Sequence, residues 1–375
     1  MALSPSPALK RNWADLDDGP AGLIADRLLA YDVAGYVRFR AVCREWRRCS
    51  ADPRAHGSLD RRFHPRWWVL LLEELATPNR RRLLNTSTGE FVQVDLPELH
   101  DHDVLGVTAE GLLVLVHAHQ PRATVRLLNP LTRHLTPLPP LTTLLPKNDH
   151  DLLSDTTFDH YFQAWGSGIL DDDSTVVLSF HKLCIFGMAK PGDACWTLVL
   201  SDVTVKPSSL VFSGRLYCVT HNLGVMVLKN QPPRLEVAAK LPTRFAPGGS
   251  VHLVENAGEL MLVHRRSWRV FGERRYAVYR VDLDAGNLCR VNSFGGAGGH
   301  ALFIGMHCSL SVPVGVFSPG SISGDTIYPG SGFAEGDYIK AYHVGDKSTT
   351  YVASQNTAQP HTLVNCLSLC TTGRP

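Results

Sequence analysis

Three segments of the chain repeat one pattern of short apolar runs, and this repeat limits the possible folds more than any other feature. Each segment begins with a glycine, continues through an apolar run, a loop and a second apolar run, and ends in a polar turn. The three segments start at Gly111, Gly214 and Gly258. The first two starts lie 103 residues apart, as do the Leu-Pro pairs that follow them, whereas Gly214 and Gly258 are 44 apart. The longer spacing therefore indicates two units, with an intervening unit around 165–202.

A period in the low forties, built mostly of strands, is the size of a four-stranded propeller blade. The runs after residue 66 are bounded by Gly, Pro, Asn or Asp, as strands usually are, and a further unit begins at His300. Dividing the 310 residues of 66–375 by the period predicts about six or seven blades. A large β-sandwich or barrel with coincidental spacing is the alternative. Three recurring tryptophans, Trp165, Trp196 and Trp268, are expected to pack within the blades.

The first fifty or so residues show helical periodicity instead. An acidic pair followed by proline, Asp17 to Pro20, is typical of a helix start. Leu23, Ile24 and Leu28 then form one apolar face. Asp32 is placed to cap a second short helix.

A third helix is predicted over 36–48, because four of its residues fall at helical spacing on one stripe: Phe39, Val42, Cys43 and Trp46. Asp52-Pro53 ends this pattern. The predicted fold class is therefore α+β and multidomain, with a small three-helix domain followed by a mainly β, propeller-like repeat domain. The predicted boundaries are 12–53 for the helical domain, 54–65 for a linker and 66–375 for the β domain.

Composition and charge exclude several classes of protein. The formal net charge of +2 on 375 residues makes no case for nucleic-acid or membrane binding. Nine cysteines, an odd number without a C-x-x-C pair, indicate reduced thiols. The N-terminus lacks the apolar core of a secretory signal, and no apolar run approaches the length of a membrane span. We expect an intracellular protein of the cytoplasm, the nucleus or both.

No catalytic, cofactor or metal site emerges from the motifs. The glycine-rich segment 295–299 lacks the strand and helix of a dinucleotide-binding turn. The segment 320–324 carries Ile322 where a nucleophile elbow has serine. Two groups, His100-Asp101-His102-Asp103 and His117-Ala118-His119, could in principle hold a metal, but we expect surface-loop histidines instead. No catalytic residue, cofactor or metal ligand is therefore nominated.

The helical segment resembles an F-box. The stretch from Phe39 to Arg47 reads F-R-x-V-C-x-x-W-R, and residues 24–28 read I-x-x-R-L. Towards the other end, the stretch 301–311, followed by F-S-P-G at 317–320 and Ile327-Tyr328, is similar to the C-terminal signature of a large plant family. In that family an F-box precedes a propeller-like domain of uncharacterised function.

The resemblance implies a substrate-recognition subunit of an SCF-type ubiquitin ligase, without a catalytic site of its own. The F-box helices would dock on a Skp-type adaptor, and through it on a cullin, while the β domain would bind an unknown target protein. The residues implied for adaptor binding, mixed with the core of the helical domain, are Leu16, Pro20, Leu23, Ile24, Leu28, Phe39, Val42, Cys43 and Trp46. Asp17 stands where F-boxes usually carry proline. A scaffold protein outside any ligase is therefore one alternative, and a propeller-housed hydrolase is another.

Overall fold

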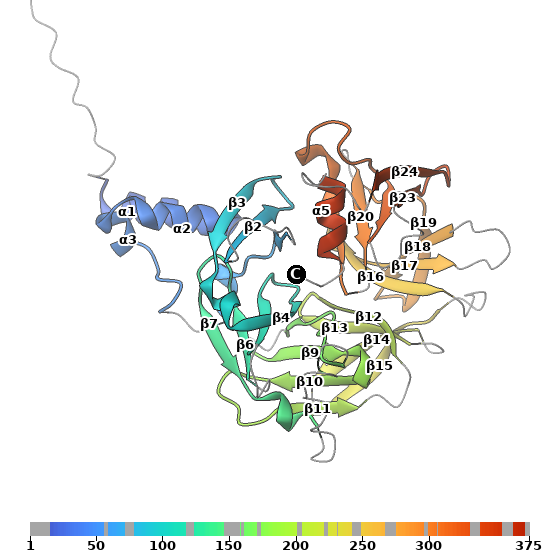
Figure 1. The fold of residues 1–375 in the computed structure, drawn as a ribbon, viewed down its shortest axis with the longest axis horizontal. Coiled ribbons are helices and arrows are strands. Elements are labelled where there is room, and N and C mark those ends of the chain that lie inside the picture. The colour runs from blue at the N-terminus through green and yellow to red at the C-terminus, as the bar shows by residue number, and fades with distance from the viewer. Residues whose placement is uncertain are drawn as a thin grey trace, which may run out of the picture.

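The chain folds as a ring of six β-sheets with a helical arm at one side (Figure 1). The structure is a computed structural model, and in the part that it describes no helix is long and apolar enough to cross a bilayer. That part comprises residues 16–55, 59–71, 79–117, 124–145, 158, 161–170, 174–200, 205–220, 224–230, 232–241, 249–266, 275–295, 299–305, 307–330, 338–354 and 363–371.

The six sheets are the blades of a propeller, numbered here along the chain. Blade 1 has three strands: β1 (Trp68–Leu70), β2 (Arg80–Asn85) and β3 (Phe91–Asp95). Blade 2 is β4 (His102–Val107), β5 (Leu113–His117), β6 (Val125–Leu128) and β7 (Leu135–Leu138). Blade 3 is β8 (Gly168–Ile169), β9 (Val176–Phe180), β10 (Ile185–Ala189) and β11 (Thr197–Leu200).

The second half of the ring has longer strands. Blade 4 is β12 (Val205–Phe212), β13 (Arg215–Thr220), β14 (Val225–Asn230) and β15 (Pro233–Ala239). Blade 5 is β16 (Ser250–Asn256), β17 (Glu259–Arg266), β18 (Arg275–Asp282) and β19 (Asn287–Val291). Blade 6 is β20 (His300–Ile304), β21 (Ser309–Pro313), β22 (Thr326–Pro329), β23 (Tyr338–His343) and β24 (Thr349–Ser354). The structure has six blades, the lower of the two predicted numbers.

The repeated glycines mark the same turn in three blades. Gly111, Gly214 and Gly258 each follow the first strand of a four-stranded antiparallel sheet and precede the second. Their φ angles are 83°, 69° and 82°, in the left-handed region that favours glycine. The unit inferred around 165–202 is blade 3. The sheet faces that pack on a neighbouring blade carry buried aliphatic side chains, so neighbouring blades share one layer of hydrophobic core.

Blade 6 departs from the simple meander of the other blades. Its strand order is β21-β20-β22-β23-β24, and β20 and β22 run parallel, with Leu302 opposite Ile327. The hairpin β20–β21 contains the stretch 301–311, which is similar to the C-terminal signature of the plant family. The parallel pair requires a crossing between β21 and β22, which runs through the 3₁₀ turn η7 (Val314–Val316).

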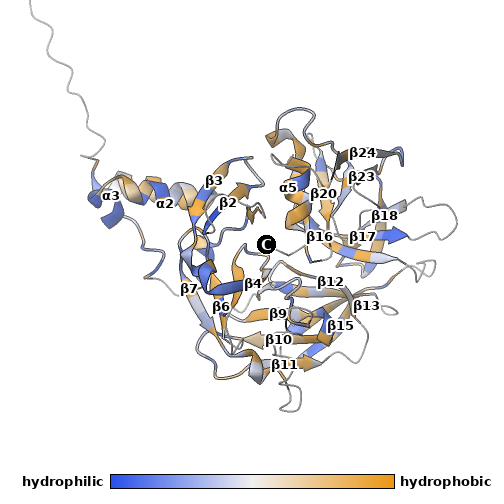
Figure 2. Cartoon of the chain, viewed as in Figure 1, coloured by the Kyte–Doolittle hydropathy of each residue, from blue (hydrophilic) through white to orange (hydrophobic). Residues whose placement is uncertain are grey.

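The ring closes through a helix instead of a shared strand. Helix α5 (Leu363–Cys370) stands between β20 and β2 (Figure 1) and is largely hydrophobic (Figure 2). Its Val364 and Leu367 share one core with Leu71 and Leu84 of blade 1 and with several side chains of blade 6. The Cys370 thiol donates a hydrogen bond of 3.1 Å to the carbonyl oxygen of Leu70. The expectation of an essentially all-β domain after residue 66 missed this helix, whose eight residues are too few for a periodic pattern.

The helical arm consists of α1 (Asp18–Tyr31), α2 (Val33–Val42) and the short α3 (Arg44–Arg48). The prediction of one continuous helix over 36–48 is wrong. The chain is extended at Cys43, with φ −152° and ψ 174°, and the Cys43 sulfur accepts a hydrogen bond of 3.4 Å from the Trp46 amide. Cys43 therefore ends α2 and begins α3, a capping role that its spacing did not reveal.

Short 3₁₀ turns complete the fold: η2 (Arg61–Phe63), η3 (Pro97–His100), η4 (Leu141–Thr143) and η6 (His181–Leu183). The first of these lies in the stretch predicted as a linker. Its Phe63 is buried against Tyr36 of the arm, with ring centroids 5.8 Å apart. The turn η2 is therefore part of the packed junction between the arm and the ring.

We predict that Leu367→Ala lowers the free energy of unfolding of the propeller by roughly 2–5 kcal/mol, because Leu367 is fully buried where α5 joins blades 1 and 6. Chemical denaturation of the full chain measures this loss. The matched control is Leu198→Ala, since Leu198 is 37% exposed on β11. Equal stability of the two variants would contradict closure by α5.

Candidate functional site

The nine residues singled out on the helical segment divide into two groups in the structure. Phe39 is buried in the core of the arm with Ala21, Ala25 and Tyr36, and Leu16 and Leu28 pack against this core. Trp46 stacks on Phe39, with ring centroids 4.5 Å apart and planes 18° from parallel. These side chains hold the three helices together, and Cys43 links two of the helices. Sequence spacing alone did not separate them from the surface.

The other group is exposed. Leu23 and Ile24 are 72% and 38% exposed, Val42 is 62% exposed, and Pro20 also lies on the surface. Tyr31, which sequence reasoning missed, is 73% exposed. At 100° per residue, one face of α1 carries the residues Pro20, Leu23, Ile24, Arg27 and Tyr31, opposite the buried face of Ala21 and Ala25. We call these five residues the outer face of α1.

A tight junction sets the arm against blade 1. The two carboxylate oxygens of Asp32 accept different hydrogen bonds: one of 2.8 Å from the Gly35 amide, which caps α2, and one of 2.7 Å from the indole nitrogen of Trp68 in β1. Ala34 packs in one core with Trp68 and Leu70. The predicted cap at Asp32 is thus confirmed, and the same side chain also ties the arm to the ring.

Further polar contacts cross the junction. Arg38 forms an ion pair of 2.5 Å with Glu90, in the turn before β3. The side-chain amide nitrogen of Asn129 donates a hydrogen bond of 2.7 Å to the carbonyl oxygen of Phe63. Arg54 donates one of 3.1 Å to the carbonyl oxygen of Thr132. Blades 1 and 2 therefore both hold the arm.

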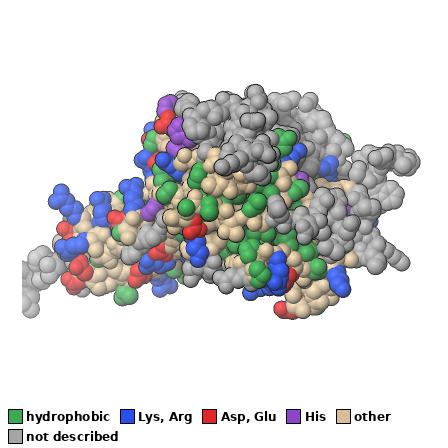
Figure 3. Space-filling model, turned by 90° about the horizontal axis from the view of Figure 1, so that it is seen from below, with side chains coloured by type: hydrophobic (Ala, Val, Ile, Leu, Met, Phe, Trp, Pro, Cys, Tyr) green, Lys and Arg blue, Asp and Glu red, His purple; other side chains and the backbone are tan. Residues whose placement is uncertain are grey.

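The arginines interleaved with the apolar stripe have distinct roles. The guanidinium group of Arg40, only 11% exposed, donates to the carbonyl oxygens of Arg47, Ser50 and Ala51 and lies 3.3 Å from the Asp52 carboxylate. Arg40 therefore fastens the end of α3 to α2. Other basic side chains of the arm lie on the surface, at the left end of the molecule in Figure 3.

The second candidate site is the central channel of the propeller. Residues from all six blades line a cavity of about 550 Å³, within the range of pockets that hold small ligands. The inner strands contribute backbone, aliphatic groups and serine hydroxyls such as those of Ser208 and Ser309. Among the described residues, the Lys, Arg, Asp and Glu side chains that line it are Arg66 and Glu255.

An aromatic contact narrows this channel. Trp165, just before β8 in blade 3, meets His307, in the turn between β20 and β21 of blade 6, with ring centroids 4.8 Å apart and planes nearly perpendicular. Blades 3 and 6 are opposite one another in a six-bladed ring, so the contact spans the channel. Trp165 also stacks on His181. Trp165 is buried, as expected, but it lines the cavity as well, whereas Trp196 is a packing residue that donates to the carbonyl oxygen of Pro139. Trp268 lies outside the described residues.

Burial controls the ionisation of the channel groups. It lowers the pKa of His252 to about 3, with the charge of Arg265 acting in the same direction, so this imidazole is neutral at physiological pH. Burial also raises the pKa of the Cys308 thiol to about 12 and raises the pKa of Glu255, while Arg66 acts to lower the latter. In the described part of the channel, the neutral imidazole of His252 and thiol of Cys308 therefore lie near the guanidinium group of Arg66 and the carboxyl group of Glu255.

Contrary to expectation, His102 and His117 lie on strands and not on surface loops, and His119 lies outside the described residues. His102 begins β4, is largely buried and lies opposite His117 of β5, with ring centroids 5.5 Å apart. Its Nδ1 is 2.9 Å from the carbonyl oxygen of Glu98. Among the described residues, no group of three or more His, Cys, Asp or Glu side chains is arranged to hold a metal ion.

Residues 64–350 match the sequence model of the KIB1-4 beta-propeller family. The chain belongs to this family. The match starts in the junction with the arm and reaches into β24, so it covers the six blades up to the start of β24 and leaves α1–α3 and α5 outside. No curated protein sequence is similar enough to the chain to count as a relative.

Solved structures of low identity resemble this member of the KIB1-4 beta-propeller family. A protein from Lactobacillus plantarum is 11% identical, with a TM-score of 0.40, over 76% of this chain and 80% of the other. A putative 6-phosphogluconolactonase from Bacteroides fragilis is 12% identical, with a TM-score of 0.33, over 76% and 93%. The dihydro-heme d1 dehydrogenase NirN is 11% identical, with a TM-score of 0.28, over 80% and 69%.

The two hydrogen bonds accepted by Asp32 predict how strongly substitutions at this position destabilise the protein. Asp32→Ala removes the cap of α2 and the acceptor for Trp68, and we expect it to lower the free energy of unfolding by roughly 2–4 kcal/mol. Asp32→Asn keeps one of the two oxygen acceptors and should lose only one of the two hydrogen bonds, so its loss should be smaller than that of Asp32→Ala. Chemical denaturation measures both, and equal losses in the two variants would show that the acceptor oxygen is not what stabilises the junction.

The depressed pKa of His252 predicts a pH dependence of stability. Between its unfolded value near 6.5 and its folded value of about 3, the unfolded chain binds a proton that the folded chain does not. Stability is therefore lost as pH falls through this window, by up to about 1.4 kcal/mol per pH unit from this one group. In denaturation at pH 6, 5 and 4, His252→Asn should flatten this slope, whereas His100→Asn at an exposed site should leave it unchanged. An unaltered slope in His252→Asn would contradict the burial of a neutral imidazole.

Proposed function

We propose that the chain is the substrate-recognition subunit of an SCF-type ubiquitin ligase. The helical arm docks on a Skp-type adaptor, the adaptor connects to a cullin, and the propeller binds the target protein. The observation that carries the proposal is the outer face of α1, which exposes large apolar side chains that the core of the arm does not use.

The exposure of this face argues for a partner. Leu23, Ile24 and Tyr31 lie on one side of a single helix, and none of them belongs to a core cluster of the described residues. Contiguous apolar side chains on a surface are typical of protein interaction sites. Full burial of an exposed side chain of this size contributes about 1.5–3 kcal/mol, and less for Ile24, which is only 38% exposed, so the face offers a favourable contribution to a complex.

The sequence of the arm selects the kind of partner. The F-box resemblance rests on residues that pack its core, such as Phe39 and Trp46, and on the I-x-x-R-L stretch that contributes Ile24 to the outer face. A helical face that fits the groove of a partner is a recurrent mode of recognition. A Skp-type adaptor is the partner that this resemblance implies.

The junction gives the arm a second role in the proposal. Asp32 and Arg38 contact blade 1 directly, and Asn129 of blade 2 holds Phe63, which packs on the arm. An adaptor bound at α1 therefore keeps a defined position relative to the propeller. A ligase receptor must present its target at a defined place. We propose that the target binds around the mouth of the channel, where the turns at Gly111 and Gly258 line the cavity.

We predict that the double variant Leu23→Asp, Ile24→Asp binds a purified Skp-type adaptor about a hundredfold more weakly than the wild type, because two buried apolar contacts are replaced by carboxylates. Its free energy of unfolding should fall by no more than about 1–2 kcal/mol, since Leu23 is 72% exposed and Ile24 is 38% exposed and aspartate is only a moderately poorer helix former. Calorimetric titration of the full chain with the adaptor provides the affinity. Val237→Asp, at a 48% exposed position on β15, is the control and should bind normally.

Trp46→Ala separates a surface effect from a folding effect. Loss of the stacked indole, which is partly buried, should cost up to about 3–5 kcal/mol in the arm and abolish adaptor binding together with the fold of the three helices. Failure of the wild type to bind the adaptor would favour the scaffold alternative. Unchanged binding by the double variant would place the docking surface elsewhere.

A further inference from the structure

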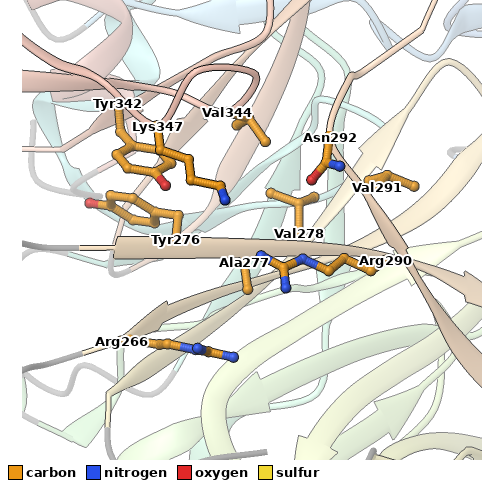
Figure 4. A pocket seen from close by; sticks show the side chains of 10 residues that line it. All are labelled: Arg266, Tyr276, Ala277, Val278, Arg290, Val291, Asn292, Tyr342, Val344 and Lys347. Atoms are coloured by element: carbon orange, nitrogen blue, oxygen red, sulfur yellow. The ribbon is translucent and has the colours of Figure 1, made fainter.

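A small basic notch lies between the outer parts of blades 5 and 6 (Figure 4). It has a volume of about 100 Å³, and its lining includes Arg266 at the end of β17, Arg290 in β19 and Lys347 in the turn before β24. In Figure 4 the charged ends of Lys347 and Arg290 point toward one another. Three cationic groups from three separate elements therefore line one recess.

These charges are not neutralised within the described part of the chain. No carboxylate lines the notch, and none of the three cations forms an ion pair there. The Nε of Arg266 is buried without a hydrogen-bond partner. Placing like charges together in a partly enclosed site raises the free energy of the empty protein, and an anion would reverse this effect.

The nearest carboxylate in the sequence already has other partners. Asp346 precedes Lys347, but its Oδ1 lies 3.0 Å from His343 Nδ1 and accepts a hydrogen bond of 2.9 Å from the Ser348 amide. These hydrogen bonds, led by those from Ser348, lower the pKa of Asp346 to about 2. They also shape the turn that carries Lys347, whose φ is 65°. The turn therefore presents the ammonium group of Lys347 to the notch, while the carboxylate of Asp346 is engaged by His343 and Ser348 within the turn.

The sheet geometry creates the recess. Strand β18 extends past β19: the pairing between them begins at Val278 and Val291, so residues 275–277 have no partner on β19. The side chains of Tyr276 and Tyr342, with ring centroids 5.1 Å apart, form an aromatic wall beside this open edge. The result is a notch with an aromatic side and a cationic side.

We propose that this notch binds a phosphate group. Arginine pairs with tetrahedral oxyanions through two parallel hydrogen bonds, and lysine adds a point charge. A doubly charged phosphate matches three cations better than a singly charged carboxylate does, and the small volume fits the phosphate group without a sugar and base. The ligand is either free phosphate or a phosphorylated side chain, and the site is independent of the proposed adaptor surface.

The test is calorimetric titration of the full chain at low salt with two probes: inorganic phosphate and a short Gly-Ser peptide that contains one phosphoserine. We expect saturable binding of at least one probe, weakened about tenfold or more in the double variant Arg290→Gln, Lys347→Gln. The exposed arginine of the control Arg80→Gln lies on β2, and this variant should bind as the wild type does. Tighter binding of the peptide identifies a phosphorylated side chain as the ligand, and equal or tighter binding of inorganic phosphate identifies the free anion.

Two results would overturn the proposal: no saturable binding of either probe to the wild type, or equal affinities in the wild type and the double variant. Both variants change exposed positions and should keep the unfolding curve of the wild type. Titration with the Skp-type adaptor, in which the double variant should match the wild type, keeps this outcome separate from that of the proposed ligase function.

Discussion

The carboxylate of Asp32 is the interaction on which the arrangement of arm and ring depends. One oxygen caps α2 and the other accepts the indole hydrogen of Trp68 in the first strand of the propeller. The residue that starts the second helix therefore also determines where that helix meets blade 1. Ala34 and Phe63 add apolar contacts on either side of it. Because the contact is made at the start of α2, the outer face of α1 remains free.

Closure of the ring is the second constraint. Blade 1 has three strands and blade 6 has five, and α5 fills the space between them with Val364 and Leu367. A propeller has no single growing core, since each pair of neighbouring blades shares its own layer. This accounts for a length that would be awkward for one compact core. The same construction leaves an axial channel and notches at the blade edges, which are the places where ligands can bind.

The sequence predicted features that depend on local pattern. The glycines at 111, 214 and 258 gave the blade period because the turn they occupy needs a positive φ. Asp32 was identified as a cap for the same kind of local reason. The break at Cys43 was missed because its apolar neighbours have helical spacing on both sides of the break. The short helix α5 was missed because packing against two blades, and not periodicity, stabilises it.

Features that depend on residues far apart in the chain could not be predicted. Trp165 and His307 meet across the channel although 142 positions separate them. Sequence spacing alone could not separate the core residues of the arm from its surface residues. That separation depends on which side of α1 packs inward: Ala21 and Ala25 are buried and Leu23 is exposed. The basic notch could not be predicted either, because it depends on the offset of β18 against β19 and on Lys347, which comes from the neighbouring blade.

The central claim is that the arm presents a docking surface for an adaptor while the ring remains available for a target. Hydrogen exchange of the full chain, alone and with a Skp-type adaptor, tests it most directly. The account predicts slower exchange of the backbone amides of α1 in the complex, with the blades exchanging as in the free protein. Protection of the propeller blades without protection of α1 would contradict it.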